Sequence, residues 1–548
     1  MAVVDIVIVV VFLVLTFLVG SFFYKWVGDP DDFYVAGRQL TPFILAAVIT
    51  ATNVNLYSFV GQAGIAYNHG ISILWQTWTG NMALVFSGLF IIPIMRRLRV
   101  RTIPEFLGMR YNDNVRILIS FLWVFRLAFW LGVVLYTAVI AAQAITGIDS
   151  YVFWIFAFAV VAIIYTVLGG MWSVAFTDVI QFVFMLGGAL IVLPMAMAAV
   201  GWMPGLIEKL PEHSMDLVRS TGTYNWKFIL AIFLLGIEWA SVDQGLLQRA
   251  FGAQNTRTVA KGLVLAGIIT TPFALLWNLP GLAASVLYPG LENPDQAIPT
   301  LLSNMLPPVV LGLVVCGLLS SQLSTISGNL NGVATLFTND IYERLRKRPA
   351  TPKEILKIAR IMTFLVGVFM ILFAFAVPVM GGAVEAYLTI IGIMDMPLFI
   401  VGIVYGLLWK RSTSSGAILG YISGAVAGII GKFILDFDFN LTTFLSAGVA
   451  LVVTPVFSLL TKSEKEEKIN KIWTAKTISD EEKEAGDIYH IIPKTSKGKL
   501  SLTVYASGVV LFLAGVVSGS SDWPYASFLA VTGMVVYFLG GYLKVKFD

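Results

Sequence analysis

Long runs of apolar residues, separated by short polar segments, occupy most of the chain. The runs lie at 4–24, 41–66, 71–95, 117–146, 151–170, 175–201, 226–250, 258–288, 307–338, 357–380, 385–409, 414–435, 441–461, 501–519 and 523–543. Because a helix needs about 20 apolar residues to cross a bilayer, each run predicts a transmembrane helix, about fifteen in all. The runs are continuous, which excludes a transmembrane β-barrel, since the strands of a barrel alternate apolar and polar residues.

The composition agrees with an all-α, polytopic membrane protein. Of the 548 residues, 58% are hydrophobic and 12% are charged, whereas about 25% of the residues of a soluble domain are charged. The one cysteine, Cys316, excludes a disulfide framework and a cysteine metal site. The three histidines, His69, His213 and His490, have no partners at metal-ligand spacing, and the sequence has no reactive constellation of an enzyme. We therefore expect a protein without catalytic activity.

Basic residues are concentrated in alternate loops. They occur at 25–38, 96–101, 249–261, 344–348, 410–411 and 544–546, and in the other set of loops only 202–225 carries Lys209 and Arg219. Since loops rich in Lys and Arg stay in the cytoplasm, we expect a multi-pass protein of the plasma (cell) membrane, with the N-terminus outside and the C-terminus in the cytoplasm. The segment 462–500 is rich in Lys, Asp and Glu. It is expected to be a cytoplasmic linker, too short for an attached catalytic domain.

Five charged residues lie within the apolar runs. They are Arg126, Asp178, Glu238, Asp243 and Asp395. A charge at the centre of a membrane helix costs about 2.5–3.5 kcal/mol on insertion scales, so such residues are candidates for function. Two plainer interpretations stay open. Asp178 is near the start of its run and could reach the interface, and Arg126 could pair with one of the acids in a structural role.

Two of the predicted helices are interrupted by polar and small residues. The interruptions lie at 50–58 and 236–245, five helices apart. An odd interval is what an inverted repeat of five plus five helices requires. Broken helices at corresponding positions of two repeats are typical of transporter binding sites, where unwound carbonyls face cations. The alternative is polar packing between helices, which is common for single Ser or Thr residues.

The ninth predicted helix has a face of hydroxyl side chains. It carries Ser320, Ser321, Ser324, Thr325 and Ser327, and positions 321, 324, 325 and 328 share one side of a helix. Hydroxyls and backbone carbonyls together supply several neutral oxygens to a hard cation such as Na⁺. The alternative is a face of small residues that lets two helices pack closely.

Several short motifs accompany the hydroxyl face. They lie at 32–38, 101–106, 165–170 with 177–181, 248–249 and 338–342. With these motifs the chain resembles the sodium:solute symporter family, which contains the sodium/glucose, sodium/proline and sodium/sialic acid cotransporters. The resemblance implies a leucine-transporter-type core of two inverted five-helix repeats. The expected parts are an extra helix at 1–30, the first repeat at 31–201 (helices 2–6), an extracellular loop at 202–225, the second repeat at 226–411 (helices 7–11), two peripheral helices at 412–461, the linker at 462–500 and two C-terminal helices at 501–548.

The resemblance also implies a principal sodium site. Carried over residue by residue, the ligands would be the carbonyls of Ala51, Val54 and Ser321 and the hydroxyls of Ser324 and Thr325. Relatives with a second sodium site pair an aspartate with hydroxyls one turn further along the same helix. Here the aspartate would be Asp178, together with Ser327, while Gly328 stands where a second hydroxyl is expected.

Candidate solute contacts surround the two broken helices. They are Asn53, Ser58, Thr77, Trp130, Arg126, Asp243 and Gln244. The positions at which sugar-transporting relatives hold the sugar look like Ser58, Thr77, Asp243 and Thr270 here. Because most of the sugar contacts are missing, glucose and galactose are not carried over. Asp243 and Glu238 would favour a positive group of a solute, whereas Arg126 and Trp130 would favour a carboxylate, so a zwitterion would satisfy both.

The predicted function is sodium-coupled secondary active symport. Na⁺ and a small organic solute, of the sugar, amino acid or carboxylate class, would enter the cell by alternating access. The expected partners are Na⁺, the solute and the lipid bilayer, without nucleic acid, and the oligomeric state does not follow from the sequence. Two other classes stay open. A transporter-like membrane sensor would need a signalling domain, and a sodium-dependent channel would conduct fast and without coupling.

Overall fold

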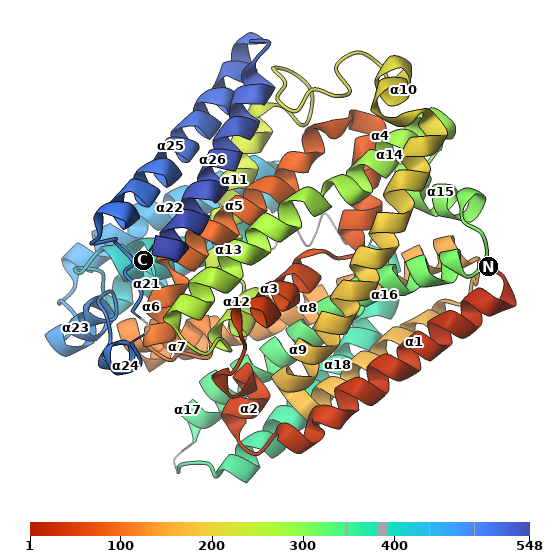
Figure 1. Ribbon diagram of the computed structural model, residues 1–548. Helices are drawn as coiled ribbons and strands as arrows, with labels where there is room; N and C mark the ends of the chain where they lie inside the picture. The colour runs from red at the N-terminus through yellow and green to blue at the C-terminus, as the bar shows by residue number, and fades with distance from the viewer. Residues whose placement is uncertain (347, 381–391, 438, 487, 548) are drawn as a thin grey trace.

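The computed structural model describes residues 1–346, 348–380, 392–437, 439–486 and 488–547. Ten helices of this part of the chain are long and apolar enough to cross a membrane. They are α1 (Val3–Phe22), α8 (Asp113–Thr146), α9 (Tyr151–Val200), α13 (Thr256–Phe273) continued by α14 (Leu275–Leu287), α16 (Val310–Thr335), α18 (Pro352–Ala376), α21 (Ser414–Phe433), α22 (Phe439–Leu460), α25 (Ser496–Ser518) and α26 (Ala526–Phe547). Figure 1 shows how they are arranged.

Two further spans are bent pairs of helices, at the two interruptions predicted from the sequence. The first pair joins α3 (Pro42–Asn53) to a π-helical turn (Tyr57–Gln62) and α4 (Ala63–His69), with a bend of 59°. The second pair joins α11 (Trp226–Val242) to α12 (Gln244–Phe251), with a bend of 50°. Both bends fall within apolar segments, so each one leaves backbone groups without helical partners inside the protein.

The predicted helices are confirmed. The runs at 151–170 and 175–201 are two helices that form the two parts of α9, joined at the non-helical residue Gly170 without a loop between them. Gly170 has φ 51° and ψ −137°, and a side chain there would come within 2.5 Å of the carbonyl oxygen of Phe33. The shorter α5 (Leu74–Phe90) and an apolar helix at Gly392–Leu408 account for two more runs. Residues 385–391 of the latter run lie outside the described residues.

The most deeply buried span is α16. In its most apolar stretch 89% of the residues are buried, and it packs against α9, α8, α1, α18, α3 and α12. The extra N-terminal helix α1 holds the start of α16, because the Asp5 carboxylate accepts hydrogen bonds from the amides of Val309 (2.7 Å) and Gly312 (3.1 Å). The helix with the hydroxyl face is thus fixed on several sides.

Short helices lie at the two ends of the transmembrane helices (Figure 1). One end carries α2 (Pro30–Val35), α6 (Ile92–Arg97), α7 (Ile103–Arg110), α17 (Glu343–Leu345), α23 (Glu466–Thr474) and α24 (Asp480–Glu484). We call this end the α7 face. The opposite end carries α10 (Trp202–Lys209) and α15 (Ala297–Met305), and we call it the α10 face. The N-terminus lies at the α10 face and the C-terminus at the α7 face.

The charged segment 462–500 is packed onto the α7 face. Arg97 of α6 donates a hydrogen bond to Glu482 at 2.9 Å, and the two side chains are only 2% and 5% exposed. Lys476 donates to the carbonyl of Leu407 at 2.6 Å. The described residues of the segment predicted as a linker, 462–486 and 488–500, therefore follow α22 and pack against the α7 face before α25 begins.

Candidate functional site

The first break frees backbone carbonyls inside the membrane. Helix α3 ends at Asn53, and Val54 has extended backbone angles (φ −94°, ψ 104°). The last four carbonyls of a helix have no amide donors within the helix. Among the described residues, the Thr50 carbonyl accepts a hydrogen bond from the amide of Val54 at 3.1 Å. Ala51 and Val54 are each 1% exposed. Their carbonyls are therefore buried acceptors that suit a cation.

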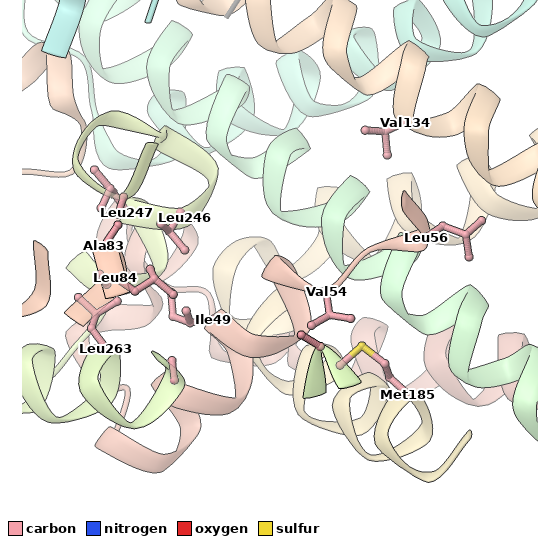
Figure 2. Packing of buried hydrophobic residues seen from close by; sticks show 14 of the residues in the cluster. Ile49, Val54, Leu56, Ala83, Leu84, Val134, Met185, Leu246, Leu247 and Leu263 are labelled. Atoms are coloured by element: carbon pink, nitrogen blue, oxygen red, sulfur yellow. The ribbon is translucent and has the colours of Figure 1, made fainter. Parts of the chain in front are cut away.

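A glutamine side chain fixes this break to two neighbouring helices. Gln322 of α16 accepts a hydrogen bond from the amide of Leu56 at 3.3 Å and donates one to the carbonyl of Val134 of α8 at 2.5 Å. Figure 2 shows Val54 and Leu56 on the non-helical segment that leaves α3, among the same buried hydrophobic residues as Val134. Sequence reasoning missed Gln322, although its place next to Ser321 was a signal.

The hydroxyl face of α16 contains one unpaired oxygen. Ser321, Ser324 and Thr325 are buried, and the Thr325 hydroxyl donates to the carbonyl of Ser321 at 3.0 Å. The Ser324 hydroxyl is buried and faces the Asp178 carboxyl group, but it makes no hydrogen bond of normal geometry with a described residue. Because α3 packs against α16, the predicted sodium ligands lie on elements in contact, and the unpaired hydroxyl fits a cation ligand.

The aspartate predicted for a second sodium is buried inside the protein and paired with an arginine. Asp178 and Arg249 are both fully buried, and the Arg249 guanidinium reaches Oδ2 of Asp178 from Nη2 at 3.1 Å and from Nε at 3.2 Å. The same guanidinium donates to the carbonyls of Gly245 (2.7 Å) and Ser324 (3.0 Å). Arg249 thus connects α9, the second broken helix and α16.

Gly328 provides the space for this guanidinium. A side chain at Gly328 would collide with the terminal nitrogens of Arg249. The hydroxyl of Ser327, also predicted for the second site, donates to the carbonyl of Ser324 at 3.2 Å. The predicted role of Asp178 and Ser327 stays a prediction. Oδ2 of Asp178 and the Ser327 hydroxyl have protein partners, whereas Oδ1 of Asp178 is buried without a hydrogen-bond partner among the described residues.

The second break is charged. Helix α11 ends at Val242, and Asp243 caps α12 by accepting a hydrogen bond from the amide of Leu246 at 2.9 Å. Nη1 of Arg126 lies 3.6 Å from Oδ2 of Asp243, and Nη2 of Arg126 pairs with Asp395. The structure thus pairs Arg126 with two of the buried acids. The sequence had suggested a structural pair with one of them.

Several predicted solute contacts lie near the first break. The Thr77 hydroxyl donates to Gln62 at 3.0 Å, and Gln62 also accepts from Trp277 at 3.0 Å. Ser58 is 5% exposed, and the side-chain oxygen of Asn53 is buried without a partner. Trp130 is half-buried on α8, one turn from Arg126.

Gln244 lies apart from these residues, toward the α7 face. Its side chain accepts from the amide of Ile103 at 3.2 Å and donates to the carbonyl of Arg101 at 3.2 Å. Its predicted role in solute binding stays a prediction, but its polar groups are used by α7. The Thr102 hydroxyl donates to Asp340 at 2.6 Å nearby. These contacts join α7 to the second broken helix and to the segment that follows α16.

Comparisons with known sequences place this arrangement in a family. The model of the sodium:solute symporter family matches residues 33–424. The chain is 28% identical over 437 residues to a sodium/glucose cotransporter of Vibrio parahaemolyticus, with 74% of this chain and 79% of that protein covered. It is 27% identical over 434 residues to an uncharacterized symporter of Escherichia coli (strain K12), with 75% of each covered.

The fold is also known. A sodium-coupled sialic acid symporter, solved in a substrate-bound, outward-open state, matches with a TM-score of 0.78 and 21% identity over 85% of this chain and 99% of that chain. The predicted leucine-transporter-type core, with its broken helices, is thereby confirmed. The family model covers most of the chain, including both breaks and the hydroxyl face of α16, so the chain belongs to the sodium:solute symporter family.

Proposed function

We propose that the chain imports a small organic solute together with Na⁺, and that Na⁺ binds between the end of α3 and α16. As a member of its family, the chain is a sodium-coupled symporter that works by alternating access. The observation that carries the proposed site is the Ser324 hydroxyl, which is buried and unpaired on the helix that packs against α3.

The proposed Na⁺ ligands are five neutral oxygens. They are the carbonyls of Ala51, Val54 and Ser321 and the hydroxyls of Ser324 and Thr325. Because no ligand carries a formal charge, Na⁺ binding is weak enough to reverse in every cycle. The ligands belong to α3, its break and α16, so bound Na⁺ holds these elements together. Moving α3 away from α16 separates the ligands and releases the ion.

The driving force is sufficient for accumulation of a neutral solute. One Na⁺ that moves down a potential of about 100 mV gains about 2.3 kcal/mol. A tenfold concentration gradient adds about 1.4 kcal/mol. Together these terms support an accumulation of roughly several hundredfold.

We infer that one Na⁺ is coupled per cycle. The second site would need the Asp178 carboxylate, to which Arg249 donates at 3.1 and 3.2 Å. A fixed positive charge at this distance compensates the carboxylate and repels a second cation, and the effect is strong where water is excluded. Gly328 supports this inference, because a hydroxyl side chain at that position would displace the guanidinium.

We propose that the α7 face lies in the cytoplasm, because it carries the loops rich in Lys and Arg. The N-terminus would then be outside. The contacts of Gln244 and Thr102 on the α7 face would close the cytoplasmic end of the site, so Na⁺ and solute would enter from the α10 face. The two repeats, at 31–201 and 226–411, would move relative to each other to open the other end.

The test is Na⁺-dependent thermal stabilisation of the purified protein, with K⁺ replacing Na⁺ at constant ionic strength. In the double variant Ser324→Ala/Thr325→Ala, the Na⁺ concentration for half-maximal stabilisation should rise at least about tenfold, which corresponds to about 1.4 kcal/mol. Ser320→Ala is the matched control, because the Ser320 hydroxyl donates to the carbonyl of Cys316 at 2.7 Å within the same helix. An unchanged Na⁺ requirement in the double variant would rule out the proposed site.

A further inference from the structure

Four charged side chains meet inside the membrane between α8, α11 and the helix at Gly392–Leu408. They are Arg126, Glu238, Asp243 and Asp395, and we call them the acidic cluster. Arg126, Glu238 and Asp395 are 4%, 1% and 3% exposed, and the side chain of Asp243 is 16% exposed. The cluster contains three carboxyl groups and one guanidinium.

The guanidinium is already used by two of the acids. Arg126 pairs with Asp395 and lies 3.6 Å from Asp243. Asp243 receives further support from the amide of Leu246 at the start of α12. A carboxylate inside the membrane is costly unless it is paired. The cluster therefore has one guanidinium for three carboxyl groups and lacks positive charge.

Two carboxyl oxygens of the cluster have no hydrogen-bond donor. Oε1 of Glu238 and Oδ1 of Asp395 are both buried without a partner. The charged groups that act on Glu238 are Asp395, Arg126 and Asp243. Among the described residues, the only positive charge of this set is Arg126, which already pairs with the other two acids. The geometry thus leaves two buried acceptors and a charge deficit at one place.

We propose that the acidic cluster binds the ammonium group of the solute, with Glu238 as its principal partner. An ammonium group supplies both a positive charge and three N–H donors, which matches the missing charge and the two unpaired oxygens. A bare metal cation would need a larger set of oxygens and would lie close to the Arg126 guanidinium. A sugar that has only hydroxyl groups would leave the charge deficit in place.

The second break gives the ammonium group a route to the cluster. Asp243 lies in the break and is the most exposed member of the cluster. Trp130, one turn from Arg126 on α8, is half-buried, and aromatic faces of this kind attract cations. This inference rests on the proposed symport function and names the class of its solute, a small molecule with an amine.

The experiment compares matched solutes on the purified full-length protein in saturating Na⁺. Each pair consists of an amine and its amine-free analogue: glucosamine and glucose, alanine and propionate, and lysine and hexanoate. Thermal stabilisation is expected from at least one amine and from none of the amine-free partners. In Glu238→Gln the concentration of that amine for half-maximal stabilisation should rise at least tenfold. Glu208→Gln, on the exposed surface of α10, is the control for loss of a carboxylate and should behave as wild type.

The outcomes separate this inference from the proposed function. Stabilisation of wild type by Na⁺ alone tests the sodium site and does not involve the acidic cluster. If amine-free analogues stabilise the protein as well as the amines, or if no amine stabilises it, the inference is overturned while the sodium site stands. An unchanged amine affinity in Glu238→Gln overturns it too. If, instead, wild-type stability without solute changes between about pH 5 and 8 and Glu238→Gln removes this change, a proton and not the solute occupies the cluster.

Discussion

The two broken helices use opposite chemistry at the same kind of backbone bend. At the break after α3 the available groups are uncharged, namely the carbonyls of Ala51 and Val54 and the hydroxyl of Ser324 across the contact with α16. At the break after α11 the side chains are charged, with Asp243 in the bend and Arg249 on the following helix.

This difference indicates which groups move and which stay. Neutral oxygens bind a cation that arrives from water and leaves again in each cycle. Fixed ion pairs such as Arg249 with Asp178 stay in the protein, and they hold the second broken helix to α9 and α16. We therefore propose that a mobile ion is exchanged at the first break, while the ion pair of Arg249 with Asp178 stays in place next to the second break.

The largest effect should follow from removing the permanent charge at the second break. Arg249→Met leaves Asp178 buried without a counter-charge, so the free energy of unfolding should fall by about 3–5 kcal/mol. Thermal unfolding in detergent measures the change. Asp178→Asn/Arg249→Met removes both charges and should regain most of the loss. An Arg249→Met protein as stable as wild type would remove the basis for a fixed charge at this break.

A smaller effect should follow from releasing the first break from α16. Gln322→Leu leaves the amide of Leu56 and the carbonyl of Val134 without their partner, which should cost about 1–3 kcal/mol. Hydrogen–deuterium exchange should rise in the segment 53–58, and Na⁺ affinity should fall. Ser320→Ala on the same helix is the control, because it loses only a hydrogen bond to the Cys316 carbonyl within α16. Unchanged exchange in Gln322→Leu would mean that the break is held by other contacts.

The smallest effect should come from the charge of Asp243. Asn caps helices as well as Asp does, so Asp243→Asn mainly removes the interaction with Arg126 across 3.6 Å. We expect a loss of about 1 kcal/mol in unfolding free energy, since the two atoms lie 3.6 Å apart and Arg126 keeps Asp395 as its partner. Na⁺ titrations should give the wild-type half-saturation within about twofold, about 0.4 kcal/mol. A large loss of Na⁺ affinity would show that the two breaks do not act separately.

The sequence predicts the spans well because their length is set by the bilayer. It did not predict that the two parts of α9 are joined at Gly170 without a loop, since a glycine between two apolar runs is compatible with a sharp bend or with a loop. It also missed the docking of 462–500, because the contact between Arg97 and Glu482 joins positions 385 residues apart. A contact between positions so far apart cannot be predicted from a local sequence pattern.

The candidate site was predicted unevenly for the same reason. The hydroxyl face of α16 and the interruption after α3 are local patterns that are visible in the sequence. The partner of Asp178 is not, because Arg249 lies 71 residues further along the chain. One signal was available: a buried acid needs a positive partner, and Arg249 is a basic residue next to the second interruption.

The central claim is that one Na⁺ binds at the first break. Equilibrium binding of radiolabelled Na⁺ to the purified protein tests it most directly, since it counts ions per chain. The account predicts one saturable Na⁺ per chain in wild type, little or no binding in Ser324→Ala/Thr325→Ala, and wild-type binding in Ser320→Ala. Two saturable ions per chain, or one that persists in the double variant, would contradict it.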